Sequence, residues 1–377
     1  MKTIKKILLK ILLVLLPVVL FFALLEGAAR VREYWYPPLQ VDIGQGFDAE
    51  SLLFHPAGDG DMKTNPDKVT AFHEQRFSMP KPPRTMRIFA LGGSSVNYLD
   101  YEFSLMAKEL QQAWADRFDE VEIINCGGLS YGSHRLVLMM AEILHYEPDL
   151  VLLYSGHNEF EELQQLQLSN LEFVTAQRTL GYSALYRFIR DMRAKKQIEA
   201  LHEASARRQL AASLPDTSKA WAYEFTDAEV SVRMDAYRDN LVAIIKKCRY
   251  NDIPVIIGTV PSNLWRPNLP GQAGREYEAA VRLFEAGKYE EGLALGRTLL
   301  REATPRHQAS DVESQIIRDV AAQLETPLAD VEQAILGAEP HHVPGETLFR
   351  DHCHLNAAGN ALLRQVYQEK ILEVVSF

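Results

Sequence analysis

Cysteine is scarce in this 377-residue chain, which has three cysteines and therefore no disulfide-stapled scaffold. Cys126, Cys248 and Cys353 leave room for one disulfide at most, and three buried thiols are the simpler interpretation. A basic excess is also missing, since 40 Lys and Arg stand against 50 Asp and Glu, a net charge of −10. Nucleic-acid binders need a basic face for phosphate groups, so the composition argues against that class.

Two familiar site patterns are missing from the sequence as well. Metal-binding residue types gather near the C-terminus, but their spacing matches no standard zinc site, and we expect no metal. They are His341, His342, Asp351, His352, Cys353 and His354. The nucleophile elbow G-x-S-x-G of α/β-hydrolases is not matched either, because Val96 occupies the position of its last glycine.

The N-terminus carries a long apolar segment. Four lysines within the first ten residues lead into the uncharged run 11–25. Counted from Ile7, the stretch would span roughly 28 Å as a helix, close to the hydrocarbon thickness of a bilayer. The lysines predict a cytoplasmic N-terminus, with the rest of the chain outside. We expect an uncleaved signal anchor over residues 1–32, a single transmembrane helix in the inner (plasma) membrane with a periplasmic main domain. A cleaved signal peptide and a buried helix are the alternatives.

Downstream of the anchor, residues 33–85 are rich in Pro, Gly and Asp, which predicts a spacer with at most a short strand or two. Apolar runs separated by segments with helical periodicity then follow. These runs are 87–91, 121–125, 150–154 and 254–260. Continuous apolar runs suit strands buried on both faces. The alternation therefore predicts a parallel sheet covered by helices, with the chemistry in loops at the carboxyl ends of the strands.

Two helical, charged segments interrupt the expected main domain, 86–377, at about 161–235 and 267–340. The first resembles a lid or an insertion. Part of the second, 279–290, resembles one helical hairpin of a tetratricopeptide repeat, but a single hairpin cannot build a solenoid. We expect both to be amphipathic helical inserts packed on the main domain.

Four short polar motifs follow the apolar runs or precede a helix. They are Gly92-Gly93-Ser94-Ser95, Asn125-Cys126-Gly127-Gly128, Gly156-His157-Asn158-Glu159 and Asp351-His352-Cys353-His354. Ser94 would lie at a helix N-terminus, whose free N–H groups favour negative charge. Asp351 and His354 can meet in a turn, so that the carboxylate fixes the tautomer of the imidazole. The other ring nitrogen would accept the serine proton, and His157 is a weaker candidate for this base.

In this order, the four motifs resemble those of the SGNH/GDSL hydrolase family. The resemblance covers about residues 85–160, 237–262 and 345–377. It departs from the family at Gly93, where an aspartate is common, and at Glu159, where an aspartate is usual. Both departures lie beside the residues expected to react.

The resemblance implies a three-layer flavodoxin-like parallel sheet flanked by helices, here in a membrane-anchored bacterial member with helical inserts. It implies a catalytic triad of Ser94, His354 and Asp351. The oxyanion hole would combine the N–H groups of Ser94 and Gly127 with the side chain of Asn158. Neither a metal nor an organic cofactor is implied.

The activity implied is a serine esterase or acylhydrolase working outside the cytoplasm. Its substrate would carry an ester on a small molecule, a glycan or a lipid, and O-acetyl groups of an envelope polysaccharide are favoured. An O-acyltransferase of envelope polysaccharide would use the same triad. A non-catalytic, membrane-anchored binding or assembly protein, with a protein partner on the helical inserts, is the third hypothesis.

Overall fold

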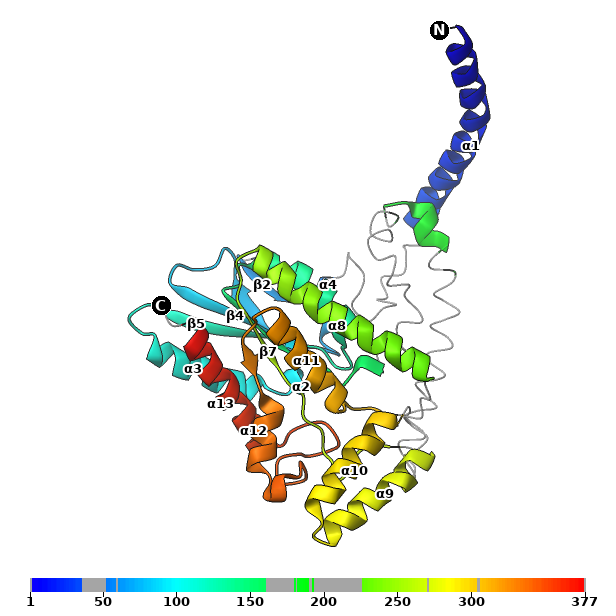
Figure 1. Ribbon diagram of the computed structural model, residues 1–377. Helices are drawn as coiled ribbons and strands as arrows, with labels where there is room; N and C mark the ends of the chain where they lie inside the picture. The colour runs from blue at the N-terminus through cyan, green and yellow to red at the C-terminus, as the bar shows by residue number, and fades with distance from the viewer. Residues whose placement is uncertain are drawn as a thin grey trace. The chain divides into compact units, whose positions relative to one another are not determined.

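The computed structural model describes most of the chain in several stretches. They are residues 2–35, 52–58, 60–160, 182–189, 226–269, 271–303 and 306–375, with residues 180 and 192. The chain divides into two compact units, residues 1–49 with 166–206 and residues 50–165 with 207–377. All residues of the predicted site belong to the second unit. Figure 1 shows the helices and strands of the chain.

The first unit contains helix α1, Lys2–Trp35, with Pro17 inside it. Glu33 of this helix pairs with Arg187 at 2.6 Å, and both side chains are largely buried. Within the part of the chain that the structure describes, no helix has both the length and the apolar character that a bilayer-spanning helix needs. The membrane anchor and the location outside the cytoplasm therefore stay predictions.

The second unit is built on a five-stranded parallel sheet with the strand order β5-β4-β6-β7-β8. The strands are β4 Thr85–Gly92, β5 Glu120–Gly127, β6 Leu150–Tyr154, β7 Val255–Gly258 and β8 Leu328–Ala329. Counted along the chain, this is the flavodoxin-like order 2-1-3-4-5. Every residue of β4, β6 and β7 is buried, as expected of strands covered on both faces.

Helices cover both faces of this sheet (Figure 1). One layer consists of α3 Asp100–Ala113, α12 Val331–Ala338 and α13 Ala357–Val374. The other consists of α4 Ser133–Ile143, α8 Asp227–Tyr250 and α11 Asp311–Gln323. The predicted parallel sheet flanked by helices is thus confirmed.

The structure places a small sheet inside the predicted spacer, 33–85. Strands β1 Phe54–Pro56, β2 Asp61–Thr64 and β3 Arg76–Ser78 form an antiparallel sheet. The ring of Phe77 packs edge to face on Phe54 at 4.9 Å and on Phe89 of β4 at 5.7 Å between centroids. The Pro and Gly residues therefore mark turns of a small sheet that shares the main core. Residues 36–51 lie outside the described residues.

The second predicted insert, 267–340, contains two different structures. Helices α9 Gly271–Glu285 and α10 Tyr289–Glu302 form a hairpin with a small apolar core of its own around Tyr277 and Phe284. By contrast, α11, β8 and α12 complete the main α/β layers. The hairpin is thus the inserted part.

The first predicted insert, 161–235, is also bounded differently in the structure. Helix α8 begins inside it, at Asp227, and packs on the sheet and on α4 as a helix of the main layers. Residues 161–179 and 193–225 of this predicted insert lie outside the described residues.

Candidate active site

The nucleophile candidate lies where the strand order reverses. Ser94 follows β4 and is the first residue of helix α2, Ser94–Asn97, while Asn158 follows the neighbouring strand β6. A Cβ atom at Gly93 would lie 2.2 Å from Nδ2 of Asn158. Glycine at this position therefore lets the amide of Asn158 pack directly against the residue before the serine.

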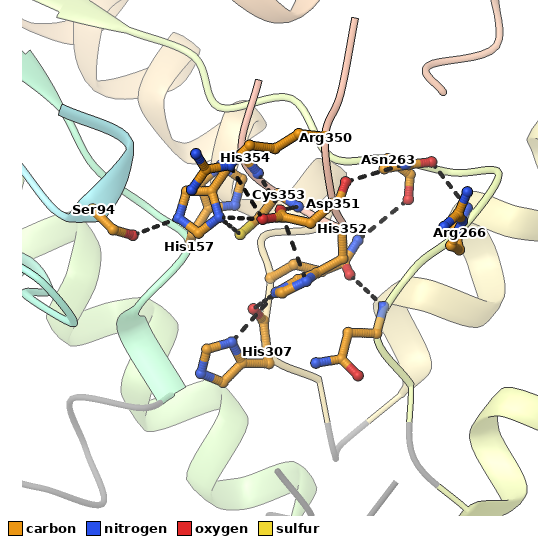
Figure 2. A network of polar contacts seen from close by, with 12 residues as sticks. Ser94, His157, Asn263, Arg266, His307, Arg350, Asp351, His352, Cys353 and His354 are labelled. Carbon is orange, nitrogen blue, oxygen red and sulfur yellow. Dashed lines mark hydrogen bonds and ion pairs between the residues drawn. The ribbon is translucent and has the colours of Figure 1, made fainter. Parts of the chain in front are cut away.

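The loop between α12 and α13 brings a histidine to this serine from far along the chain (Figure 2). Oγ of Ser94 lies 2.7 Å from Nε2 of His354, and Nδ1 of His354 lies 2.8 Å from Oδ2 of Asp351. Since a carboxylate only accepts hydrogen bonds, Nδ1 carries the ring proton and Nε2 accepts from the hydroxyl. The structure thus brings the three predicted triad residues into one hydrogen-bonded line.

The carboxylate of Asp351 is also held by the backbone of its own turn. Its Oδ1 accepts hydrogen bonds from the N–H groups of Cys353 at 3.0 Å and His354 at 2.7 Å. Burial alone would raise the pKa of Asp351, but the hydrogen bonds from the His354 ring and these two N–H groups lower it well below the ordinary value. Asp351 is therefore ionised at neutral pH and able to stabilise an imidazolium.

Two further residues hold the base, and sequence reasoning missed both. Asn263, in the loop after β7, donates from Nδ2 to the Asp351 carbonyl at 3.1 Å and from its backbone to the His352 carbonyl at 3.0 Å. Tyr98, just after α2, packs its ring edge to face on His354 at 5.0 Å between centroids. A polar residue just past an apolar run was the available signal for Asn263; nothing singled out Tyr98.

The three predicted oxyanion donors differ in how many of their N–H groups already have a hydrogen-bond partner. Asn158 is buried and uses one amide hydrogen on the Tyr131 carbonyl at 3.0 Å. The N–H of Ser94 opens a helix and so has no partner within that helix. The N–H of Gly127, however, donates to Oδ1 of Asn125 at 2.9 Å. In this structure the group is thus engaged by a side chain of its own turn, and its role as an oxyanion donor stays a prediction.

Close packing of the backbone around Gly127 leaves no room for a side chain. A Cβ atom there would lie 2.1 Å from the backbone nitrogen of Asn97, at the end of α2. The residue lets α2 approach β5, and so fixes the height of Ser94 above the sheet.

The glutamate of the third motif, Glu159, contacts two other elements. Glu159 is fully buried and accepts hydrogen bonds from the backbone N–H and the hydroxyl of Ser133, at 2.9 and 2.7 Å. It also pairs with the buried Arg233 of α8. Glu159 thereby fastens the residue next to Asn158 to α4 and to α8.

His157, the weaker candidate for the base, is engaged elsewhere. Its Nδ1 accepts a hydrogen bond from the backbone N–H of Ala309 at 3.2 Å. Burial, followed by the neighbouring His354 and His352 rings, lowers the pKa of His157 to about 3. This ring is neutral at neutral pH, and the serine hydroxyl is hydrogen-bonded to His354 instead.

The residues weighed for a metal divide into two groups. Ligand atoms of Asp351, Cys353 and His354 all lie within 4.8 Å of one another. His341 lies outside that cluster, and its ring stacks on Tyr289 of α10 at 3.8 Å between centroids. None of the three cysteines is in a disulfide, and all are buried.

The chain matches no protein-family model and no curated protein. Solved structures of similar fold do match it. One is an acetyl xylan esterase, with a TM-score of 0.41 and 16% identity, covering 77% of this chain and 100% of the esterase. Another is an acetylxylan esterase from Geobacillus stearothermophilus, with a TM-score of 0.39 and 13% identity, covering 76% and 94%. A third is a putative GDSL-like lipase from Parabacteroides merdae, with a TM-score of 0.44 and 10% identity, covering 76% and 94%.

All three matches carry the names of esterases or lipases. With identities of 10–16% and TM-scores below 0.5, these similarities assign no function to this chain.

Proposed function

We propose that this protein is a serine hydrolase that cleaves ester bonds. The observation that carries the proposal is the hydrogen-bonded line from Ser94 through His354 to Asp351, with both contacts below 3 Å. A serine hydroxyl is a weak nucleophile at neutral pH. It becomes reactive when an adjacent base, oriented by a third group, removes its proton during attack.

The proposed reaction is acyl transfer in two halves. His354 accepts the proton of Ser94 while Oγ attacks the ester carbonyl, and Asp351 stabilises the imidazolium that forms. The N–H of Ser94 and the amide of Asn158 stabilise the oxyanion. His354 then protonates the leaving alcohol, and in the second half it activates the water that releases the acyl group. This scheme uses no metal and no organic cofactor.

Substitution of the nucleophile tests the proposal. In Ser94→Ala we expect hydrolysis of a short p-nitrophenyl ester to fall by at least about 10⁴-fold. Its circular dichroism and melting temperature should stay those of the parent protein. Ser95→Ala is the matched control, because it removes a neighbouring hydroxyl of the same turn and should keep activity. Activity retained in the purified Ser94→Ala protein would refute the assignment.

The natural substrate is proposed to be an O-acetylated polysaccharide of the cell envelope, with lipid esters as the second choice. This choice is supported by the sequence, whose N-terminal lysines and apolar run predict export with retention at the membrane. Release of acetate from acetylated glycan, compared with fatty-acid release from vesicles, distinguishes the two substrates. Faster turnover of the vesicles would reverse the order.

We also propose that α1 holds the enzyme at the membrane with its hydrolase unit outside the cytoplasm. In α1, the side chains of Leu13, Val19, Phe21 and Leu24 are each more than half exposed, and lipid would cover them. Fractionation of cells that express the full chain is the test. The enzyme should stay with the membranes after an alkaline wash and be digested by protease added to spheroplasts. Recovery in the soluble cytoplasmic fraction would contradict this proposal.

A further inference from the structure

We propose that the turn carrying the base is also a binding site for a thiophilic divalent cation, with Zn²⁺ as the expected ion. Its ligands would be Nδ1 of His354, Sγ of Cys353 and the carboxylate of Asp351, and the bound ion would switch the hydrolase off. The inhibition rests on the proposed function, whereas the binding does not.

The distances between the ligand atoms fit this ion. Sγ of Cys353 lies 3.6 Å from Nδ1 of His354. Zinc binds sulfur at about 2.3 Å and histidine nitrogen at about 2.0 Å, so a tetrahedral ion holds these two atoms about 3.5 Å apart. Oδ2 of Asp351 lies 2.8 Å from the same nitrogen and would move away by about half an ångström to reach tetrahedral spacing.

The surroundings supply support for the ligands and a route for the ion. Oδ1 of Asp351 is fixed by the two backbone N–H groups of its turn, so Oδ2 is the oxygen that would face the cation. Nε of Arg350 lies 3.7 Å from Oδ2, and this guanidinium has to swing aside as the ion binds. The fourth position of a tetrahedral ion would be taken by water, as in zinc sites with three protein ligands. The side chain of Asp351 is 36% exposed, so the ion enters from the carboxylate side.

The ligand types decide which cation binds. A thiolate with an imidazole and a carboxylate suits Zn²⁺, whereas Mg²⁺ and Ca²⁺ require oxygen ligands. The sequence pattern Asp-x-Cys-His matches no standard zinc spacing, because those spacings describe ligands on helices or in knuckles. Here a single tight turn brings the three groups together.

Binding would change the tautomer of the base. The Cys353 thiol releases its proton to solvent on forming the Zn–S bond. The proton of His354 leaves Nδ1 as the Zn–N bond forms, and a proton is taken up at Nε2, so one proton is released per ion. Nε2 would then donate to Ser94 Oγ rather than accept from it. A base that already carries this proton cannot activate the serine.

Zinc titration of the full chain tests the site. We expect Zn²⁺ to inhibit ester hydrolysis while Mg²⁺ and Ca²⁺ do not. In Cys353→Ala the inhibitory concentration, measured relative to the zinc-free activity of the same variant, should rise by at least about 10- to 100-fold. Cys248→Ala, which removes another buried thiol, is the matched control and should keep the parent sensitivity. Equal inhibition of the parent protein and Cys353→Ala would overturn the proposal.

A binding measurement keeps the test independent of activity. Co²⁺ added to the protein should produce a cobalt–thiolate charge-transfer band with one ion per chain. Zn²⁺ should displace this band, and Cys353→Ala should lack it. If the band forms but no ester is hydrolysed, the proposed function fails while the cation site stands. Absence of the band in the parent protein would remove the cation site whatever the activity.

Discussion

At the scale of single residues, the site separates proton transfer from charge stabilisation. His354 and Asp351 come from one turn near the C-terminus, whereas Asn158 follows a central strand of the sheet. The two tasks are therefore held by different parts of the fold. A substitution can weaken one of them while the geometry of the other is preserved.

Asn158→Ala is expected to lower kcat by about 100- to 1,000-fold with a much smaller change in KM. The amide is assigned to the oxyanion, which exists only in the transition state and the tetrahedral intermediate. Steady-state kinetics on a p-nitrophenyl ester provide the measurement, with the melting temperature as a check on folding. A rise in KM at unchanged kcat would instead place the amide in ground-state substrate binding.

The buried ring of His157 makes stability depend on pH. Its pKa is lowered to about 3, whereas the unfolded ring takes up a proton below its ordinary pKa of 6.5. The free energy of unfolding therefore falls as the pH drops from 6.5 towards 3, by up to about 1.4 kcal/mol per pH unit for this residue. Above pH 6.5 the ring is neutral in both states and the contribution to the slope vanishes.

His157→Asn should remove this part of the slope, because asparagine does not titrate and keeps an acceptor for the N–H of Ala309. Urea unfolding at several values between about pH 4 and pH 6 provides the measurement. His352, whose pKa burial lowers to about 4, contributes to both proteins alike. Identical slopes in the two proteins would contradict the prediction.

The sequence predicted the residues of the Ser94–His354–Asp351 line because their types and motif positions carry the signal. It could not show that the backbone N–H of Gly127 is already hydrogen-bonded. Whether a backbone N–H is available depends on a side chain nearby, here Asn125, and on how close two elements approach. Neither property can be predicted from the order of the residues alone.

At the scale of elements, buried ion pairs join the loops of the site to the helices around them. Glu159, beside Asn158, pairs with Arg233 of α8, and Glu313 of α11 pairs with Arg306 at 2.7 Å. All four side chains are almost fully buried. Removing one member of such a pair leaves its partner's charge buried without compensation.

Glu159→Gln should therefore lower the free energy of unfolding by about 3–5 kcal/mol, since it leaves Arg233 without its carboxylate. Asp319→Asn is the matched control, because Asp319 pairs with Arg238 at 3.2 Å near the surface, where the cost is about 1 kcal/mol or less. Urea unfolding of both variants gives the comparison. Equal losses in the free energy of unfolding would show that the buried pair contributes no more to stability than the surface pair.

The strands that were found from the sequence are those with continuous apolar runs. Strand β8 was missed because Leu328–Ala329 is too short to produce a pattern, although it pairs with β7. The small sheet β1–β3 was predicted only as a short strand or two within a spacer, for a different reason. Its strands are three or four residues long and are separated by turns whose composition resembles that of a linker.

At the scale of the whole molecule, the core of the second unit extends further towards the N-terminus than the α/β pattern indicates. Rings of β1 and β3 pack on Phe89 of the central strand. The backbone N–H groups of Leu53 and Phe54 donate to the partly buried Glu142 of α4 at 2.8 and 2.9 Å. The small sheet is therefore part of the folded core of this unit and contributes to its stability.

Truncation tests this boundary. A chain that starts at residue 50 should fold and hydrolyse ester, because it keeps β1 to β3. A chain that starts at residue 86 loses the aromatic contacts to Phe89 and the hydrogen bonds to Glu142. We expect it to be insoluble or to melt well below the longer form, since burying such rings contributes several kcal/mol. Equal melting temperatures of the two forms would show that residues 52–85 do not stabilise the fold and act as a spacer.

The lengths of the connections around the sheet have a consequence for engineering and divergence. The links that enter β6, β7 and β8 are short, 147–149, 251–254 and 324–327, whereas those that leave β6 and β7 are long, 155–226 and 259–310. The long connections thus leave the sheet at the edge where Ser94 lies, and the short ones enter it at the opposite edge. Exchanging these long connections between homologous proteins should change substrate specificity. The short connections that precede β6, β7 and β8 would stay unchanged, so the sheet should still form.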